Sequence, residues 1–248
     1  PRYAEEQSFG VIASPSSNIS AVLGSSSLVI CGALEDVIVW NVKTGRALKR
    51  LRDQDCGSIV TCIATQPQSK ERIVAGYADG SIRIWNVTSG QLIVKLHGHK
   101  KSVTCLSFNA NASQLVSGAD DTDIIVWDIV SQRGRFRLRG HKDAVTACAF
   151  LDQDRKLITS SKDTLIKIWD LETQHAVTTC VGHRSEIWTI AVNRDETRVV
   201  TASSDRQLRV WALSSSDATL TYMGSIKRQS TARSCLLAFN TTELARLA

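Results

Sequence analysis

Hydroxyl, imidazole and carboxylate side chains recur together three times in this 248-residue chain. These residue types form a hydrolase triad, in which the imidazole takes a proton from the hydroxyl and the carboxylate orients the imidazole. The three sets are His99, Ser117 and Asp121; His141, Thr159 and Asp163; and His183, Thr201 and Asp205. Catalysis needs one such set, whereas a repeated fold uses one in each repeat. We therefore interpret the sets as a structural network, and we expect no enzyme activity.

A tryptophan stands six residues after each aspartate and completes each set, at Trp127, Trp169 and Trp211. The histidines, aspartates and tryptophans all recur at intervals of 42 residues. A period of about 40–45 residues, with Gly-His near its start and tryptophan near its end, is typical of a four-stranded propeller blade. When buried aspartate, histidine, hydroxyl and indole groups are linked in that order, each donor and acceptor finds a partner.

Short apolar runs predict the strands that position these side chains. One of them alternates strictly, Leu165-Ile166-Lys167-Ile168-Trp169. We expect an all-β WD-repeat propeller with five complete blades, strands of closing blades including one near residues 9–12, and a place in a seven-bladed ring. The whole of 1–248 is then one incomplete propeller, with blades at about 18–52, 58–97, 98–139, 140–181 and 182–226 and the start of a sixth at 233–248.

The first two repeats lack the full set of polar residues. The first has no Gly-His, and Asp36 stands four residues before Trp40. The second keeps Asp79 and Trp85 but has Ala75 at the hydroxyl position. The network in these two repeats is therefore predicted to be degenerate.

Composition limits the other classes of function. No apolar run approaches the 18 residues of a membrane-spanning helix. The seven cysteines include no CxxC pair, so we expect neither a metal site nor a disulfide framework, and buried free thiols indicate a reducing compartment. Nothing resembles a phosphate-cradling loop, and we expect no cofactor and no small-molecule substrate. The net charge of +6 is compatible with a nucleic-acid or acidic protein partner.

Basic residues follow each network histidine and flank the turn aspartates. In a propeller these loops emerge on one face, so they form a cationic arc suited to phosphate or an acidic peptide. Polar loop tips exposed to solvent are the alternative interpretation. The predicted partner-binding residues are Lys100, Lys101, Lys142, Lys162, Arg184 and Arg206.

Four further residues have a simpler expected role. Arg83, Lys167 and Arg209 each stand two residues before a tryptophan, and we expect them on solvated strand faces. Trp188 lies outside the repeated series, in a first strand. Core filling is its expected role, and a partner contact is the alternative.

These residues resemble WD-repeat propellers over nearly the whole chain. More narrowly, the segments DTDIIVWD (121–128), TQH (173–175) and VGHRSEIW (181–188) resemble the N-terminal propeller of the U-three protein twelve family, also called WD repeat-containing protein three. The resemblance implies a scaffold subunit of the UTP-B subcomplex of the small-subunit processome, which serves pre-rRNA processing and 40S ribosome assembly in the nucleolus.

The resemblance also implies partners. These are other WD-repeat subunits, with U-three small nucleolar RNA and pre-rRNA in the same particle and no membrane. A second propeller and a helical C-terminal region are implied as well. The alternative function is that of a WD-repeat adaptor in another complex, such as a ubiquitin-ligase substrate receptor.

Overall fold

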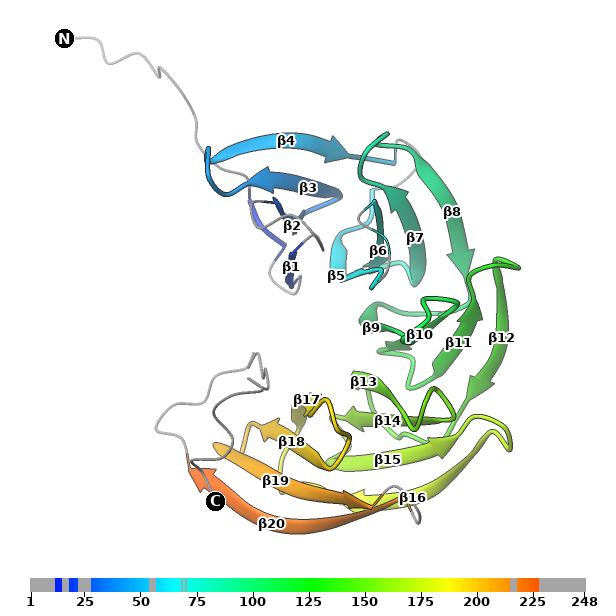
Figure 1. Ribbon diagram of the computed structural model, residues 1–248, viewed down its shortest axis with the longest axis vertical. Helices are drawn as coiled ribbons and strands as arrows, with labels where there is room; N and C mark the ends of the chain where they lie inside the picture. Colours follow the sequence, from blue (N-terminus) through cyan, green and yellow to red (C-terminus); the bar gives the residue numbers. More distant parts are fainter. Residues whose placement is uncertain are drawn as a thin grey trace, which may run out of the picture.

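The described residues form strands and turns, with no helix among them. The structure is a computed structural model that describes residues 12–14, 18–21, 28–53, 57–67, 69, 71–214 and 218–227. Within these residues, twenty strands form five antiparallel sheets of four strands each. The sheets follow one another around an arc, and the first strand of each sheet lies nearest its centre (Figure 1).

Each sheet is built from four consecutive strands. The first two sheets contain β1 Ile19–Ala21, β2 Leu28–Ala33, β3 Asp36–Asn41, β4 Arg46–Leu51, β5 Val60–Thr65, β6 Arg72–Tyr77, β7 Ser81–Asn86 and β8 Leu92–His97. The third and fourth contain β9 Val103–Phe108, β10 Gln114–Ala119, β11 Ile124–Asp128, β12 Arg133–Leu138, β13 Val145–Leu151, β14 Lys156–Ser161, β15 Leu165–Asp170 and β16 His175–Val181. The fifth contains β17 Ile187–Val192, β18 Arg198–Ser203, β19 Gln207–Ser214 and β20 Thr219–Lys227.

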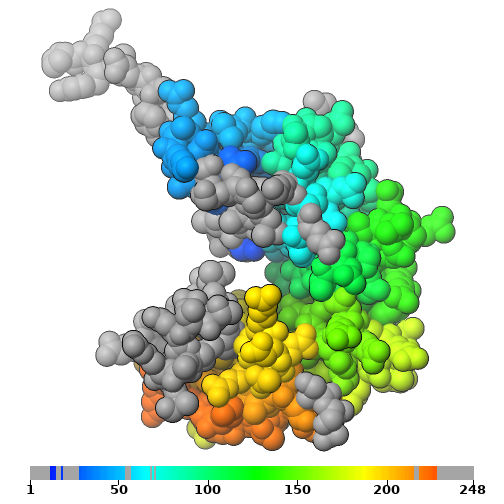
Figure 2. All heavy atoms as spheres, viewed as in Figure 1, coloured from blue at the N-terminus to red at the C-terminus, as the bar shows by residue number. Residues whose placement is uncertain are grey.

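The hydrophobic core consists of clusters shared by neighbouring sheets. In the space-filling view, the atoms of successive sheets lie against one another along the arc (Figure 2). Alternate residues of a strand point to opposite faces of its sheet, so β15 serves two interfaces. Ile166 and Ile168 pack towards the fifth sheet with Val199 and Trp211. Trp169 packs towards the third sheet in a different cluster. The same arrangement recurs along the arc, and each network tryptophan therefore contacts the preceding sheet.

The predicted all-β fold of four-stranded blades is confirmed. The sheets span 19–51, 60–97, 103–138, 145–181 and 187–227. The sixth repeat predicted at 233–248 lies outside the described residues, as do residues 9–11 of the predicted closing strand. Seven blades for the ring remains a prediction. In the described part of the chain, no helix has the length and apolar character needed to cross a membrane.

Candidate partner-binding rim and its polar network

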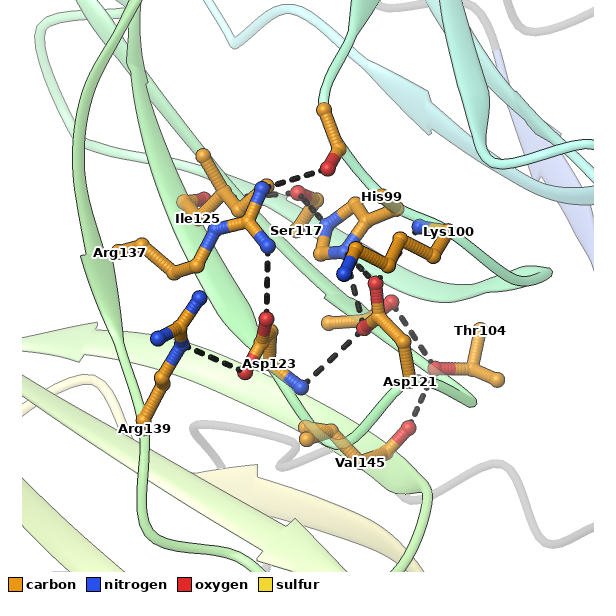
Figure 3. A network of polar contacts seen from close by, with 12 residues as sticks. His99, Lys100, Thr104, Ser117, Asp121, Asp123, Ile125, Arg137, Arg139 and Val145 are labelled. Carbon is orange, nitrogen blue, oxygen red and sulfur yellow. Dashed lines mark hydrogen bonds and ion pairs between the residues drawn. The ribbon is translucent and has the colours of Figure 1, made fainter.

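The third sheet brings its four predicted network residues together. His99 Nδ1 lies 3.1 Å from the Asp121 carboxylate, and His99 Nε2 lies 2.7 Å from Ser117 Oγ (Figure 3). Trp127 Nε1 donates to the same hydroxyl at 2.8 Å. Because Ser117 Oγ accepts the indole N–H, its own proton is available to His99 Nε2. The imidazole then carries its proton on Nδ1 and donates it to Asp121.

The fourth and fifth sheets repeat this chain of contacts, with a threonine hydroxyl in place of serine. The histidine–aspartate distances are 2.8 Å for His141–Asp163 and 2.9 Å for His183–Asp205. The histidine–hydroxyl distances are 2.9 Å for His141–Thr159 and 2.8 Å for His183–Thr201. The indole–hydroxyl distances are 2.8 Å for Trp169–Thr159 and 3.0 Å for Trp211–Thr201.

Burial determines what this network can do chemically. The hydroxyls of Ser117, Thr159 and Thr201 belong to residues with 0% exposure. A nucleophilic hydroxyl must reach a substrate, and these hydroxyls are enclosed by the sheets and occupied by an indole N–H. The geometry therefore corresponds to a satisfied set of buried polar groups rather than to an acyl-transfer site.

The network also shifts the acidity of its members. Burial lowers the pKa of His99 and His183, and this effect outweighs the nearby carboxylates, so both imidazoles are held neutral. Burial alone would raise the pKa of Asp163. Hydrogen bonds from His141 and from the Lys142 and Leu165 backbone N–H groups instead lower it to about 2.

Acid is expected to destabilise the protein in two stages. The native pKa values of His99 and His183 lie below the usual 6.5, so the unfolded chain binds more protons than the native chain below about pH 6.5, and stability falls. The network aspartates have native pKa values below 3.8, so their contribution is present above that pH and is lost as the pH falls further towards about 2. Denaturant titrations from about pH 7.5 down to about pH 2 measure both stages.

A matched control for this pH dependence is the exposed His175. Replacing His175 by glutamine should leave the profile unchanged, because its ring lies outside the network. Equal stability at about pH 7.5 and about pH 5 in the wild-type protein would contradict buried neutral imidazoles.

The second sheet replaces the missing imidazole with a buried guanidinium. Arg83 Nε lies 3.2 Å from Asp53 and Nη2 lies 3.5 Å from Asp79, and the guanidinium stacks 3.9 Å from the Tyr77 ring centroid. Lys95 Nζ lies 2.7 Å from the same Asp53. The expectation of a solvated strand face for Arg83 is therefore wrong. The second repeat has no Gly-His, and the arginine side chain reaches the turn carboxylate and the tyrosine ring from β7.

Trp85 is the tryptophan of this second sheet, and it faces Ala75 where the later sheets have a hydroxyl. Within the described residues its buried Nε1 has no hydrogen-bond partner. A serine at position 75 would supply the acceptor that Ser117 supplies to Trp127. We expect Ala75→Ser to raise the free energy of unfolding by about 0.5–1.5 kcal/mol, measured by denaturant titration.

The control for this change is Ala75→Val, which adds volume without an acceptor. We expect it to give no gain in stability, because it leaves the Trp85 N–H unsatisfied. A serine variant that is no more stable than the valine variant would show that the indole is satisfied in another way.

The first sheet uses a thiol at the hydroxyl position. Trp40 Nε1 donates to Cys31 Sγ at 3.1 Å. Cys31 lies opposite Ile38, just as Ser117 lies opposite Ile125, so the two acceptors are equivalent in register. The residue count missed Cys31 because it stands nine rather than ten positions before its tryptophan. The register between neighbouring strands is the signal that identifies Cys31 as the acceptor.

Two arginines support the Gly-His loops. The sequence predicts a solvated strand face for Arg209 and does not single out Arg137. Arg137 Nη2 donates to Gly98 O at 2.5 Å, and its Nη1 lies 2.7 Å from Asp123 (Figure 3). Arg209 Nη1 donates to Gly182 O at 2.8 Å, and its side chain is 19% exposed. The solvated role expected for Arg209 is therefore wrong. These contacts fix the loop backbone immediately before His99 and His183.

The network and these arginines hold the predicted cations at one end of the sheets. The Lys100 and Lys142 backbone N–H groups donate to the network aspartates at 2.8 Å and 3.0 Å. Loops and turns at this end are joined further, for example by Lys162 N to Ala144 O at 2.9 Å. We call the six predicted cations the basic rim. Five are exposed and Lys162 is half-buried; the six are Lys100, Lys101, Lys142, Lys162, Arg184 and Arg206.

The five sheets, with a buried histidine, aspartate, hydroxyl and tryptophan network in three of them, define the chain as a WD-repeat β-propeller protein. Comparison with known families identifies a particular family within this class of protein. Residues 27–213 match the family model described as the WDR3 first beta-propeller domain. Since the match covers most of the chain, the chain belongs to that family.

Three relatives are similar to part of this chain. U3 small nucleolar RNA-associated protein 12 of Saccharomyces cerevisiae is 33% identical over 130 residues, covering 46% of this chain and 14% of that protein. WD repeat-containing protein 3 homolog of Dictyostelium discoideum is 42% identical over 102 residues, covering 41% of this chain and 10% of that protein. WD repeat-containing protein 90 of Xenopus tropicalis is 28% identical over 107 residues, covering 40% of this chain and 6% of that protein. The chain thus spans a small part of each relative's length.

Proposed function

We propose that this chain is the N-terminal propeller of a non-catalytic scaffold subunit in ribosome assembly. The subunit would belong to the UTP-B subcomplex of the small-subunit processome, act in pre-rRNA processing and 40S assembly, and reside in the nucleolus. The observation that carries the proposal is the family match over 27–213. The yeast and Dictyostelium relatives, one of them named for association with U3 small nucleolar RNA, support it.

The geometry supports scaffolding over catalysis. A scaffold must present fixed surfaces, and here the Gly-His loops of the third, fourth and fifth sheets are each tied to the interior by a buried histidine and an aspartate. The hydroxyls that would act as nucleophiles have no exposed surface. The proposed partners are other WD-repeat subunits of the same particle, with U3 RNA and pre-rRNA also present, and the basic rim is the proposed contact surface.

The test is affinity purification of the full-length protein from growing cells, with and without ribonuclease. We expect U3 RNA before ribonuclease treatment and a set of WD-repeat proteins that remains after it. Ubiquitin-ligase subunits without pre-ribosomal RNA would overturn the proposal and favour the adaptor function. A free monomer with no assembly partners would overturn both.

A further inference from the structure

Trp188 stands at a position that is occupied by threonine in three other inner strands. In β5, β9, β13 and β17 one residue is skipped in the pairing with the neighbouring strand, which marks a β-bulge. A bulge redirects the extra side chain away from the regular ladder. The skipped residues are Thr61, Thr104, Thr146 and Trp188.

Two of the threonines and the tryptophan use this position differently. Thr61 Oγ1 donates to Val103 O of the next sheet at 2.5 Å, and the Thr104 hydroxyl makes the corresponding contact one sheet further on. Trp188 has no hydroxyl, and its Nε1 donates to Ser204 Oγ at 2.5 Å. Ser204 lies in the turn after β18, so the indole is held at the end of the sheet that carries the basic rim.

Trp188 is not a core residue. It is partly exposed, and none of the four hydrophobic clusters formed by the described residues includes it. Lys162 Nζ, from the turn after β14 in the preceding sheet, lies 5.3 Å from the centroid of its ring. No carboxylate among the described residues forms a salt bridge with Lys162. An aromatic ring and an ammonium group from adjacent sheets are thus presented side by side.

The surrounding charges indicate the kind of ligand. Lys142, Arg184 and Arg206 are exposed in the neighbouring loops and turns, and so are the carboxylates of Asp143 and Glu186. A nucleic-acid backbone carries a negative charge at every phosphate and binds along an uninterrupted basic path. Interspersed carboxylates oppose such a path. A protein segment with a few acidic side chains can place them on the lysine and arginine groups and avoid the carboxylates.

We propose that Trp188 and Lys162 form a binding site for an acidic protein segment. A carboxylate of the segment pairs with the Lys162 ammonium group, and an adjacent apolar or aromatic side chain packs against the exposed part of the Trp188 indole. Tryptophan is enriched among the residues that dominate protein interfaces. The proposal specifies which part of the basic rim holds a protein partner, and in this respect it rests on the proposed scaffold function.

The first step of the test identifies the segment. In the full-length protein in growing cells, Arg206 is replaced by a photoactivatable benzophenone amino acid, which leaves Trp188 and Lys162 intact. Val130, 81% exposed in the turn between β11 and β12 at the opposite end of the sheet, is the control position. We expect cross-links from position 206, absent from position 130, to a peptide rich in Asp and Glu. Cross-links to RNA alone, or none above the control, would overturn the proposal.

The second step measures binding of the cross-linked segment, as a labelled synthetic peptide, to purified full-length protein. We expect Trp188→Ala and Lys162→Glu each to weaken binding about tenfold or more, and Lys162→Arg to retain most of it. The matched control is Arg135→Glu, because Arg135 also lies over an aromatic ring, that of Phe136 at 5.8 Å, but on the outer strand β12. Equal affinity in all four variants would overturn the proposal.

The outcomes separate this site from the proposed function. If U3 RNA copurifies with the wild-type protein while position 206 cross-links to no acidic segment, the site fails and the scaffold function stands. If the acidic peptide binds through Trp188 and Lys162 but no pre-ribosomal RNA copurifies, the site stands and the ribosome-assembly function fails.

Discussion

Asp163→Ala is expected to lower the free energy of unfolding by about 3–5 kcal/mol, because it leaves several donors without an acceptor. The carboxylate accepts from His141 Nδ1 at 2.8 Å, from Lys142 N at 3.0 Å and from Leu165 N at 2.9 Å. Its side chain is 5% exposed, so water cannot easily replace these bonds. Denaturant titration of the purified protein measures the loss.

Asp128→Ala provides the matched control for this prediction. Asp128 also accepts two backbone N–H groups, from Val130 at 2.8 Å and Ser131 at 3.1 Å, but it is the last residue of β11 and these bonds are exposed to solvent. Water can satisfy these donors, so we expect a small change. If the two substitutions had equal effects, burial of the network would not contribute to stability.

Trp169→Ala is expected to cost about 3–5 kcal/mol through the loss of packing between the third and fourth sheets. The side chain is 2% exposed and packs in a cluster with Val116, Ile124 and Val126. Trp169→Phe keeps most of this packing but removes the N–H that donates to Thr159 Oγ1 at 2.8 Å. We expect the phenylalanine variant to cost about 1–2 kcal/mol, measured by the same titration.

A second tryptophan is the control for packing. Trp188→Ala is expected to cost less than about 1 kcal/mol, since its partly exposed indole lies outside the hydrophobic clusters of the described residues. Equal losses for Trp169→Ala and Trp188→Ala would contradict the distinction between a core tryptophan and one at the rim.

The sequence predicted the parts of the molecule that repeat. The spacing of His99, Asp121 and Trp127 and of their two later copies was sufficient to predict four-stranded blades and the partners within each network. Such spacing is informative because every copy must satisfy the same buried hydrogen bonds. The fourth strand of the fifth repeat, β20, was also predicted, although its sequence pattern is weak.

The substitutions in the degenerate repeats could not be predicted in the same way. Arg83 lies on β7, whereas the imidazole in the later sheets comes from the loop before the first strand. Cys31 replaces a hydroxyl at a different spacing. Both depend on which residues lie opposite each other across the sheet, and residue counting along the chain does not give that register. A bulge in β17 places Trp188 at the rim, and the periodicity of the sequence does not predict that bulge.

The backbone connects the buried network to the surface. Asp121 and Asp163 each accept a hydrogen bond from the histidine imidazole. Each also accepts one from the backbone N–H of the lysine that follows that histidine. The same carboxylate therefore stabilises the interior and fixes a cation at the rim. This arrangement explains how a repeated structural network can present charges from distant parts of the sequence on one surface.

The buried network is structural, and we propose that the basic rim it holds binds a partner. The most direct measurement is recovery of ribonuclease-resistant partners by full-length protein carrying Lys100→Glu, Lys142→Glu and Arg184→Glu together. All three side chains are exposed, so the variant should unfold near the wild-type denaturant midpoint. We expect partner recovery to fall about tenfold or more. A folded variant that recovers its partners at the wild-type level would contradict the account.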